Sequence, residues 1–150
     1  MLDYLQYASS VFLINKVRRQ DIIGKKIFEI NDKYYFSDIG VRNAIIGGYK
    51  QVQIDKILEN VVFLQLKAQG YKVFVGKSQE KEIDFVAEKH GKITYIQVTY
   101  LIASEETKQR EFGNLIEIKD NYEKIVLSLD DFVEGDHLGI QQYNIIDRLT

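Results

Sequence analysis

The sequence predicts a mixed α/β fold of the α+β kind, and three observations lead to this prediction. Residues 53–69 carry apolar side chains at the spacing of one helix face. Residues 82–88 and 92–100 are apolar stretches of strand length, and the turn Lys89-His90-Gly91 joins them tightly enough for an antiparallel hairpin. A second helix pattern, begun by Ser104, separates this hairpin from another short apolar strand. The chain of 150 residues suits one domain, or a compact domain with a small module.

The first 48 residues predict the small module. Their patterns indicate, in order, a helix, a strand, a turn, a hairpin and a helix: residues 1–9, 11–19, 24–26, 27–37 and 38–46. Asn31-Asp32 predicts the turn of the hairpin, and Asp38 is a good N-cap for the second helix. This order resembles the back half of a winged-helix unit, and the abrupt start leads us to expect that a preceding segment is missing. We place the boundary at Gly47–Lys50, where two glycines end the helix.

Residues 49–150 predict the larger module, with the order α-β-β-β-α-β and one more strand at the end. Gly70 ends the long helix as its C′ residue, and Glu105 and Glu106 favour the positive end of the second helix. After the long helix, the predicted strands and helix are residues 71–75, 82–88, 92–100, 104–117, 124–129 and 140–145, with a polar loop over 130–139.

The composition indicates a soluble globular protein and argues against several kinds of site. Hydrophobic residues make up 45% of the chain and charged residues 28%. The absence of Cys excludes disulfides and thiolate metal sites, and fits the cytoplasm, where we expect the protein to lie. Two His residues argue against a His-based zinc site. No apolar run reaches the roughly 18–20 residues of a membrane span, and no signal-peptide pattern opens the chain, so we expect no membrane partner.

Charge is unevenly distributed along the chain. Residues 1–50 carry eight basic and five acidic groups, a net charge of +3, whereas the remainder carries twelve basic and seventeen acidic groups, a net charge of −5. A basic front favours contact with nucleic-acid phosphates, for which the candidate residues are Arg18, Arg19, Lys25 and Lys26. The alternative is a solvated surface of mixed charge.

Gly76-Lys77-Ser78 resembles the end of a phosphate-binding loop but lacks the rest of that motif. The loop needs a Gly five positions before the Gly-Lys pair and a helix after it. Position 71 is Tyr, and a strand pattern follows. We therefore interpret these three residues as a plain turn.

Polar side chains interrupt the apolar patterns at three places between residues 57 and 100. Glu59 lies on the apolar stripe of the long helix, and Asp84 lies between two apolar residues of a strand. Gln97 and Thr99 share one strand face because side chains two apart point the same way. A carboxylate on an apolar stripe is costly unless it has a partner, binds a metal or lies at the edge of the stripe. If the face of Gln97 meets the helix of Glu59, then Asp84 and Gln97 converge near Glu59. The alternative is a solvated Glu59 at the stripe's edge and an Asp84 on the polar face of a half-exposed strand.

A helix acid followed by Glu-Ile-Asp-Phe-Val at 82–86 and Tyr-Ile-Gln-Val-Thr at 95–99 resembles the restriction-endonuclease-like fold of the PD-(D/E)xK superfamily. More closely, nearly the whole chain resembles the C-terminal part of a family of bacterial and archaeal AAA+-like ATPases. Those proteins carry a P-loop domain, a winged helix and a nuclease-like domain of unknown function. The matching stretches are residues 11–19, 34–40, 57–62, 70–77, 82–86, 95–100, 105–121 and 143–147.

The resemblance implies the position of a magnesium site and also implies that the site is degenerate. In the superfamily, an Asp and the first acid of Glu-x-Lys hold Mg²⁺, and the Lys orients the attacking water. Such chemistry needs clustered carboxylates because Mg²⁺ prefers oxygen ligands. Glu59 matches the helix acid and Asp84 the metal-binding Asp, so these two would hold the metal in an active domain. Gln97 stands in the place of the second acid and Thr99 in the place of the Lys. The residues that could replace the Lys are Lys67, Lys77 and Lys81, although strand parity puts Lys81 on the face opposite Asp84.

Three functions remain as hypotheses. We prefer a degenerate nuclease fold that serves as the nucleic-acid-binding or regulatory domain of an ATPase, with DNA and the P-loop domain of the same protein as partners; ATP would bind that missing domain. The second hypothesis is an active Mg²⁺-dependent nuclease that uses Glu59, Asp84 and a relocated base. The third is a protein-interaction module without a nucleic-acid role, which the acidic back half favours.

Overall fold

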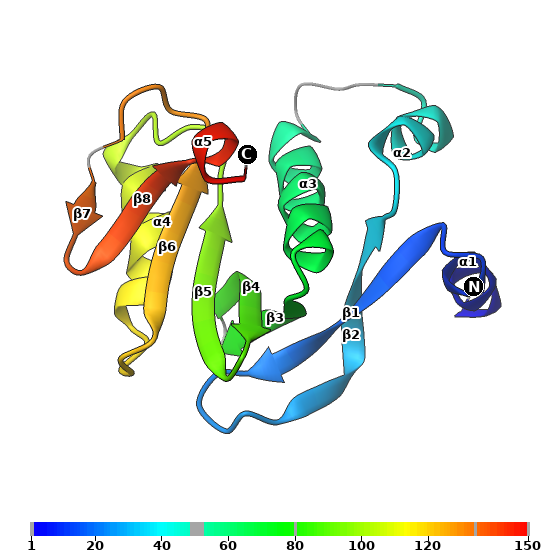
Figure 1. Cartoon of the computed structure of the whole chain (residues 1–150), viewed down its shortest axis with the longest axis horizontal. Coiled ribbons are helices and arrows are strands. Elements are labelled where there is room, and N and C mark those ends of the chain that lie inside the picture. The colour runs from blue at the N-terminus through cyan, green and yellow to red at the C-terminus, as the bar shows by residue number, and fades with distance from the viewer. Residues whose placement is uncertain (1, 49–52, 80, 134, 150) are drawn as a thin grey trace.

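An eight-stranded mixed sheet runs through the molecule and has helices on both faces, which confirms the predicted mixed α/β class (Figure 1). The computed structural model describes residues 2–48, 53–79, 81–133 and 135–149. The strand order is β2-β1-β3-β4-β5-β6-β8-β7. In chain order the elements are α1 Leu2–Ser10, β1 Ile14–Asp21, β2 Ile27–Phe36, α2 Ile39–Ile45, α3 Ile54–Ala68, β3 Lys72–Ser78, β4 Lys81–Lys89, β5 Lys92–Val98, α4 Glu105–Ile116, β6 Glu123–Ser128, β7 Asp136–His137, β8 Ile140–Asn144 and α5 Ile145–Leu149.

Helices α3 and α4 cover opposite faces of the sheet, and each face has its own hydrophobic core. On the α3 face, Val62 and Phe63 pack with Phe85 and Ile96. On the α4 face, the core residues are Phe112, Leu115, Tyr95 and Val126. Strands β4 and β5 therefore bury side chains on both faces, as their nearly continuous apolar sequences require. The order α-β-β-β-α-β predicted for the larger module is the observed order from α3 to β6.

Two helix starts are fixed by the capping residues that the sequence predicts. The Asp38 carboxylate accepts a hydrogen bond from the Val41 N–H at 2.7 Å, and Ser104 Oγ accepts one from the Thr107 N–H at 3.1 Å. Each side chain satisfies a backbone donor that has no partner within its helix. Gly70, with φ of 82°, follows α3 in the left-handed region, as a C′ glycine does.

The hairpin turn predicted at Asn31-Asp32 is wrong. Residues 27–36 form one strand, β2, that pairs antiparallel with β1, and the connection between the two strands lies at residues 22–26. Asn31 has the positive φ of 61° that suited a turn, but it lies in a bulge where the pairing jumps from Val17↔Lys33 to Arg19↔Phe28. Asn tolerates the left-handed region in bulges as well as in turns, so its presence did not decide between them.

The strands of the predicted front module extend the sheet of the back module. β1 pairs in parallel with β3, from Arg19↔Val75 to Asp21↔Lys77. Val17 and Tyr35 also belong to the core under α3. Residues 49 and 50 of the predicted boundary Gly47–Lys50 lie outside the described residues, and the division into modules 1–48 and 49–150 stays a prediction.

Several elements differ from the predicted ranges. The strand predicted over 11–19 begins at Ile14, and Val11 and Phe12 are 70% and 80% exposed. Gly76-Lys77-Ser78 continues strand β3 instead of forming a turn. The sequence did not predict α5, nor the two-residue strand β7 inside the polar loop. Among the described residues, no helix is both long and apolar enough to cross a membrane.

Candidate functional site

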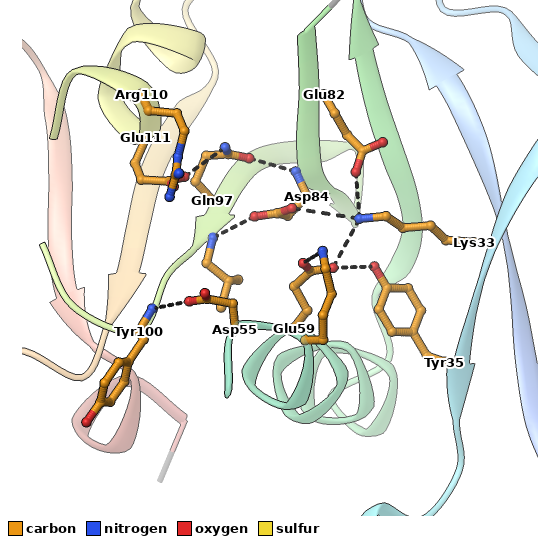
Figure 2. Close-up of polar contacts among 12 residues, drawn as sticks. Lys33, Tyr35, Asp55, Glu59, Glu82, Asp84, Gln97, Tyr100, Arg110 and Glu111 are labelled. Carbon is orange, nitrogen blue, oxygen red and sulfur yellow. Dashed lines mark hydrogen bonds and ion pairs between the residues drawn. The ribbon is translucent and has the colours of Figure 1, made fainter. Parts of the chain in front are cut away.

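The candidate site lies where β4 separates from β5 (Figure 2). The backbone pairing of these strands ends at Phe85↔Ile96. Beyond this pair, side chains replace the ladder: the Asp84 N–H donates to Gln97 Oε1 at 2.7 Å, and the Val98 N–H donates to Asp84 Oδ2 at 2.9 Å. On its other edge, β4 shifts register against β3 in the same region, between the pairs Phe74↔Val86 and Gly76↔Ile83. The extra residue of this bulge directs Asp84 away from an ordinary ladder position.

A lysine from β2 occupies the centre of the site. Lys33 Nζ lies 3.0 Å from Glu59 Oε2, 2.6 Å from Glu82 Oε1 and 3.9 Å from Asp84 Oδ1 (Figure 2). Glu59 comes from α3, whereas Glu82 and Asp84 come from β4. We call these four residues the Lys33 cluster. The side chains of Glu59, Asp84 and Lys33 are largely buried, at 5%, 14% and 19% exposed, whereas that of Glu82 is 37% exposed and reaches the surface.

Other donors complete the hydrogen bonding of the cluster's carboxylates. Lys56 Nζ lies 2.5 Å from Glu59 Oε1, and the Tyr35 hydroxyl donates to Glu59 Oε2 at 3.3 Å. Arg19 pairs with the second oxygen of Glu82. Burial and the nearby Glu59 raise the pKa of the Tyr35 hydroxyl far above its ordinary value, so Tyr35 remains a neutral donor.

The charges of the cluster change the pKa values of its members in different directions. Burial lowers the pKa of Lys33, but Glu59, Glu82 and Asp84 outweigh it, and the net pKa is raised, so Lys33 stays charged. Burial opposes ionisation of Glu82, yet hydrogen bonds from Lys33 and Arg19 hold its pKa below the ordinary value. Asp84 behaves oppositely: burial and then the repulsion of Glu59 raise its pKa to about 7, against the bond from Val98 and the charge of Lys33. The Asp84 carboxyl therefore gains a proton near neutral pH.

Gln97 points toward α4 and not toward the helix of Glu59. Its Nε2 donates to Glu111 Oε2 at 3.1 Å, and Arg110 Nη2 lies 2.7 Å from the other Glu111 oxygen. Tyr95, two residues earlier, packs in the α4 core, whereas Ile96 and Val98 lie under α3. The β5 face that carries Gln97 therefore does not meet α3. Asp84 links the Lys33 cluster to Gln97, because its carboxylate accepts from the β5 backbone and its N–H donates to the Gln97 side chain.

The lysines that the sequence offered as replacements for the missing Lys do not reach Asp84. Lys67 Nζ donates to Asn15 and Lys81 pairs with Glu117. Lys77 lines a cleft beside the cluster, and no ion pair joins it to Asp84 among the described residues. Lys33 instead comes within 3.9 Å of Asp84, and sequence reasoning missed it because β2 is far from β4 along the chain. One sequence signal could have indicated that Lys33 faces the interior: it shares a strand face with the apolar Tyr35, which is buried.

Glu59, Asp84, Gln97 and Thr99 all lie at this end of the sheet, but they differ in what they contact. The buried Glu59 is not a solvated edge residue. Thr99 is buried too, and its N–H donates to the Leu127 carbonyl at 2.9 Å. Sequence reasoning missed Glu111, whose buried carboxylate accepts the hydrogen bond from Gln97 Nε2.

The four basic residues proposed to bind nucleic acid differ in what they contact. Arg19 turns toward Glu82, while Lys25 Nζ lies 5.3 Å from the centre of the Tyr122 ring. Arg18 and Lys26 are exposed. The role of these four residues stays a prediction.

The geometry of the cluster does not fit a bound Mg²⁺. Within the described ranges, no group of three or more Asp, Glu or His side chains is placed to hold a metal ion. The ammonium of Lys33 lies among the carboxylates that would have to supply the ligands, and Gln97 Oε1 already accepts from the Asp84 N–H. What the residues can do chemically is hold a nearly neutral network of ion pairs and hydrogen bonds, with buried carboxylates and more exposed cations, that joins β2, α3, β4, β5 and α4.

Comparisons with known proteins give little functional information. No family model and no solved structure matches the chain. An uncharacterised protein of Haemophilus influenzae is 39% identical over 146 residues, which are 97% of this chain. These residues make up 36% of that protein, so the chain spans about a third of the length of the relative it matches.

Proposed function

We propose that the chain is a restriction-endonuclease-like domain that has lost its metal site and serves as a nucleic-acid-binding or regulatory domain of a larger, AAA+-like ATPase. The observation that carries the loss of the metal site is the position of Lys33 Nζ, 3.0 Å from Glu59 and 2.6 Å from Glu82. A lysine ammonium supplies a positive charge among carboxylates without binding water for attack on a phosphodiester. The cluster then stabilises the fold where an active relative would hold Mg²⁺.

The order of elements and the replaced site residues support the nuclease-like part of this proposal. The helix acid Glu59 and the strand acid Asp84 both reach Lys33, from α3 and from β4. Gln97 is bonded to Asp84 and Glu111, and its side chain carries no charge with which to bind a metal. A neutral amide in this place weakens the attraction for a divalent cation.

The ATPase part of the proposal rests on the resemblance and on the length of the relative. The Haemophilus protein has nearly two-thirds of its length outside the matched residues, which leaves room for a P-loop domain. We propose that ATP binds in that part and that this domain binds DNA or regulates the ATPase.

The test of the degenerate site is a nuclease assay together with a metal titration. Wild-type chain is incubated with single- and double-stranded DNA in Mg²⁺ and in Mn²⁺, and calorimetry measures the binding of both ions. We expect neither cleavage nor binding. Cleavage that Asp84→Ala abolishes, while the exposed-site variant Asp131→Ala retains it, would overturn the proposal.

The second candidate function is an active Mg²⁺-dependent nuclease in which Lys33 replaces the missing Lys. The observation that favours it concerns Asp84: its Oδ1 lies 3.9 Å from Lys33 Nζ, near the cation but beyond hydrogen-bond distance. Lys33→Met distinguishes the two functions: it would abolish cleavage by an active nuclease, whereas the degenerate domain has no cleavage to lose.

A protein-interaction module without nucleic-acid contact is the third possibility for the experiments to identify. Titration of the chain with labelled single- and double-stranded DNA at low salt measures directly whether it binds nucleic acid. Binding that weakens as salt rises supports the nucleic-acid-binding function. No binding of either DNA at low salt would leave the regulatory, protein-binding function.

A further inference from the structure

A cleft of about 560 Å³ opens beside the Lys33 cluster, between the β2 bulge and the neighbouring ends of β3 and β4. Its volume falls in the range of roughly 300–1,000 Å³ that is typical of small-ligand sites. Glu82 belongs to both the cleft wall and the cluster, so the two are continuous. The lining residues are Arg19, Phe28, Asn31, Asp32, Lys77, Lys81 and Glu82.

The cleft carries an excess of positive charge that is available to an anion. Three cations line it: Arg19 from β1, Lys77 from β3 and Lys81 from β4. Both acids of the wall are already paired: Asp32 Oδ2 lies 2.7 Å from Lys16 Nζ, and Glu82 pairs with Arg19 and Lys33. The other Asp32 oxygen, Oδ1, has no hydrogen-bond partner among the described residues, but the Asp32 side chain is only 8% exposed and so is largely withdrawn from a ligand.

The three cations differ in how free they are. Within the described part of the chain, no hydrogen bond or ion pair engages the Lys77 ammonium. Lys81 pairs with Glu117, but both side chains are about half exposed, and such surface pairs are weak. Arg19 uses Nε for the Asn31 carbonyl and Nη1 for Glu82, which leaves Nη2 for another acceptor.

One wall of the cleft offers an aromatic ring. Phe28, on β2 opposite Arg19, is 36% exposed. A ring of this kind beside a cationic groove is the arrangement that stacks a nucleobase while the cations contact its phosphate. Inorganic phosphate would contact only the cations, and an apolar ligand would contact only the ring, whereas a nucleotide uses both.

We propose that this cleft binds a nucleotide unit, with Phe28 stacked on the base and with Lys77, Lys81 and Arg19 contacting the phosphate. The proposal rests on the nucleic-acid-binding function proposed above and gives it a contact site. A free nucleotide and a nucleotide within a single strand present the same base and phosphate. The experiment separates these two sources.

The experiment measures binding by fluorescence anisotropy at low salt, with three probes: mant-ATP, a labelled oligothymidylate and a labelled DNA duplex. The variants are Lys77→Glu, which reverses the unengaged charge, and Phe28→Leu, which keeps apolar bulk but removes the ring. Lys92→Glu is the control, because Lys92 is an exposed lysine at the start of β5 and does not line this cleft. Urea unfolding checks that each variant folds.

We expect Lys77→Glu to weaken binding roughly tenfold and to lower the salt slope by about one. Phe28→Leu should weaken binding by about five- to a hundredfold, the range for loss of one base stack. Lys92→Glu should have little effect. Tighter binding of the oligothymidylate than of mant-ATP supports a strand as the ligand, and the reverse order supports a free nucleotide.

Two results would overturn the inference, and they differ in what they say about the proposed function. If the wild type binds a probe and both cleft variants bind it equally well, the cleft is not the site, but nucleic-acid binding stands. If no probe binds even at low salt, both the cleft and the nucleic-acid-binding function fail.

Discussion

Asp84→Asn should stabilise the protein, and the gain should increase with pH. Asn has nearly the same shape as Asp, and its Oδ1 can still accept the hydrogen bond that Asp84 Oδ2 receives from the Val98 N–H at 2.9 Å. It removes the negative charge that burial and Glu59 disfavour. An ordinary surface Asp→Asn change has no such effect.

The magnitude follows from the pKa of Asp84, which rises from 3.8 to about 7 on folding. The folded state then binds more protons than the unfolded state, so this carboxyl makes stability fall as pH rises between these values. A difference of about three pKa units corresponds to a full cost of about 4 kcal/mol above pH 7, but to only about 1 to 2 kcal/mol near pH 5. The advantage of Asn over Asp should therefore increase by about 2 to 3 kcal/mol between about pH 5 and about pH 8.

Urea unfolding of both proteins at these two pH values measures the difference, and Asp131→Asn is the control. Asp131 is exposed and makes no hydrogen bond or ion pair with other described residues. Its replacement should change stability equally at both pH values. An advantage of Asp84→Asn that stays constant or shrinks as pH rises would refute the reasoning. A rise in wild-type stability on addition of millimolar Mg²⁺ near pH 8 would refute the absence of a metal site at Asp84.

Three further predictions concern the cluster and the fold. Lys33→Met should lower the free energy of unfolding by about 2 to 3 kcal/mol, which is less than the loss of a fully buried ion pair because Lys56 and Arg19 still neutralise Glu59 and Glu82. The variant should also bind Mn²⁺, which calorimetry detects. No heat of Mn²⁺ binding would argue against Lys33 as the cation of the site. Gly76→Ala should lower the free energy of unfolding in urea by about 1 to 3 kcal/mol, because the added Cβ would lie 2.9 Å from the Ile83 Cβ. The control Gly113→Ala in α4 adds a Cβ that meets nothing within 4 Å, and it should be neutral or stabilising. Equal effects of the two variants would contradict this account. Ser104→Ala should cost about 1 kcal/mol through loss of the α4 cap, as thermal or urea unfolding will show, and an unchanged stability would mean that the cap contributes nothing.

The sequence predicted best what depends on neighbours along the chain. The starts of α2 and α4 follow from Asp38 and Ser104, whose side chains bond within their own first turns. The end of α3 follows from Gly70, the residue that adopts a positive φ without strain. The β4–β5 hairpin likewise needs only a short turn between two apolar strands.

The sequence failed where two local structures use the same residue types. Asn31 suits a turn and a bulge equally, and only the pairing of β2 with β1 decides for the bulge. Gly76 suggested a turn because its conformational freedom is visible in the sequence, but its reason lies in tertiary packing. Side chains of Ile22, Ile83 and Val86 leave no room for a Cβ within the strand.

For the candidate site, the sequence by itself determined that Glu59, Asp84, Gln97 and Thr99 are polar side chains within apolar patterns, whereas the replacement of an acid and a lysine at the last two positions stays a prediction from the resemblance. It did so because a polar side chain in an apolar helix stripe or strand is visible without any partner. Only the tertiary structure decided what those residues contact. Lys33 lies 26 residues from Glu59 along the chain, and β2 must join the sheet before its ammonium can lie between Glu59 and Glu82. Charges attract over a few ångströms in space regardless of their separation in sequence, and for that reason the cation of the site could not be read from the residues around it.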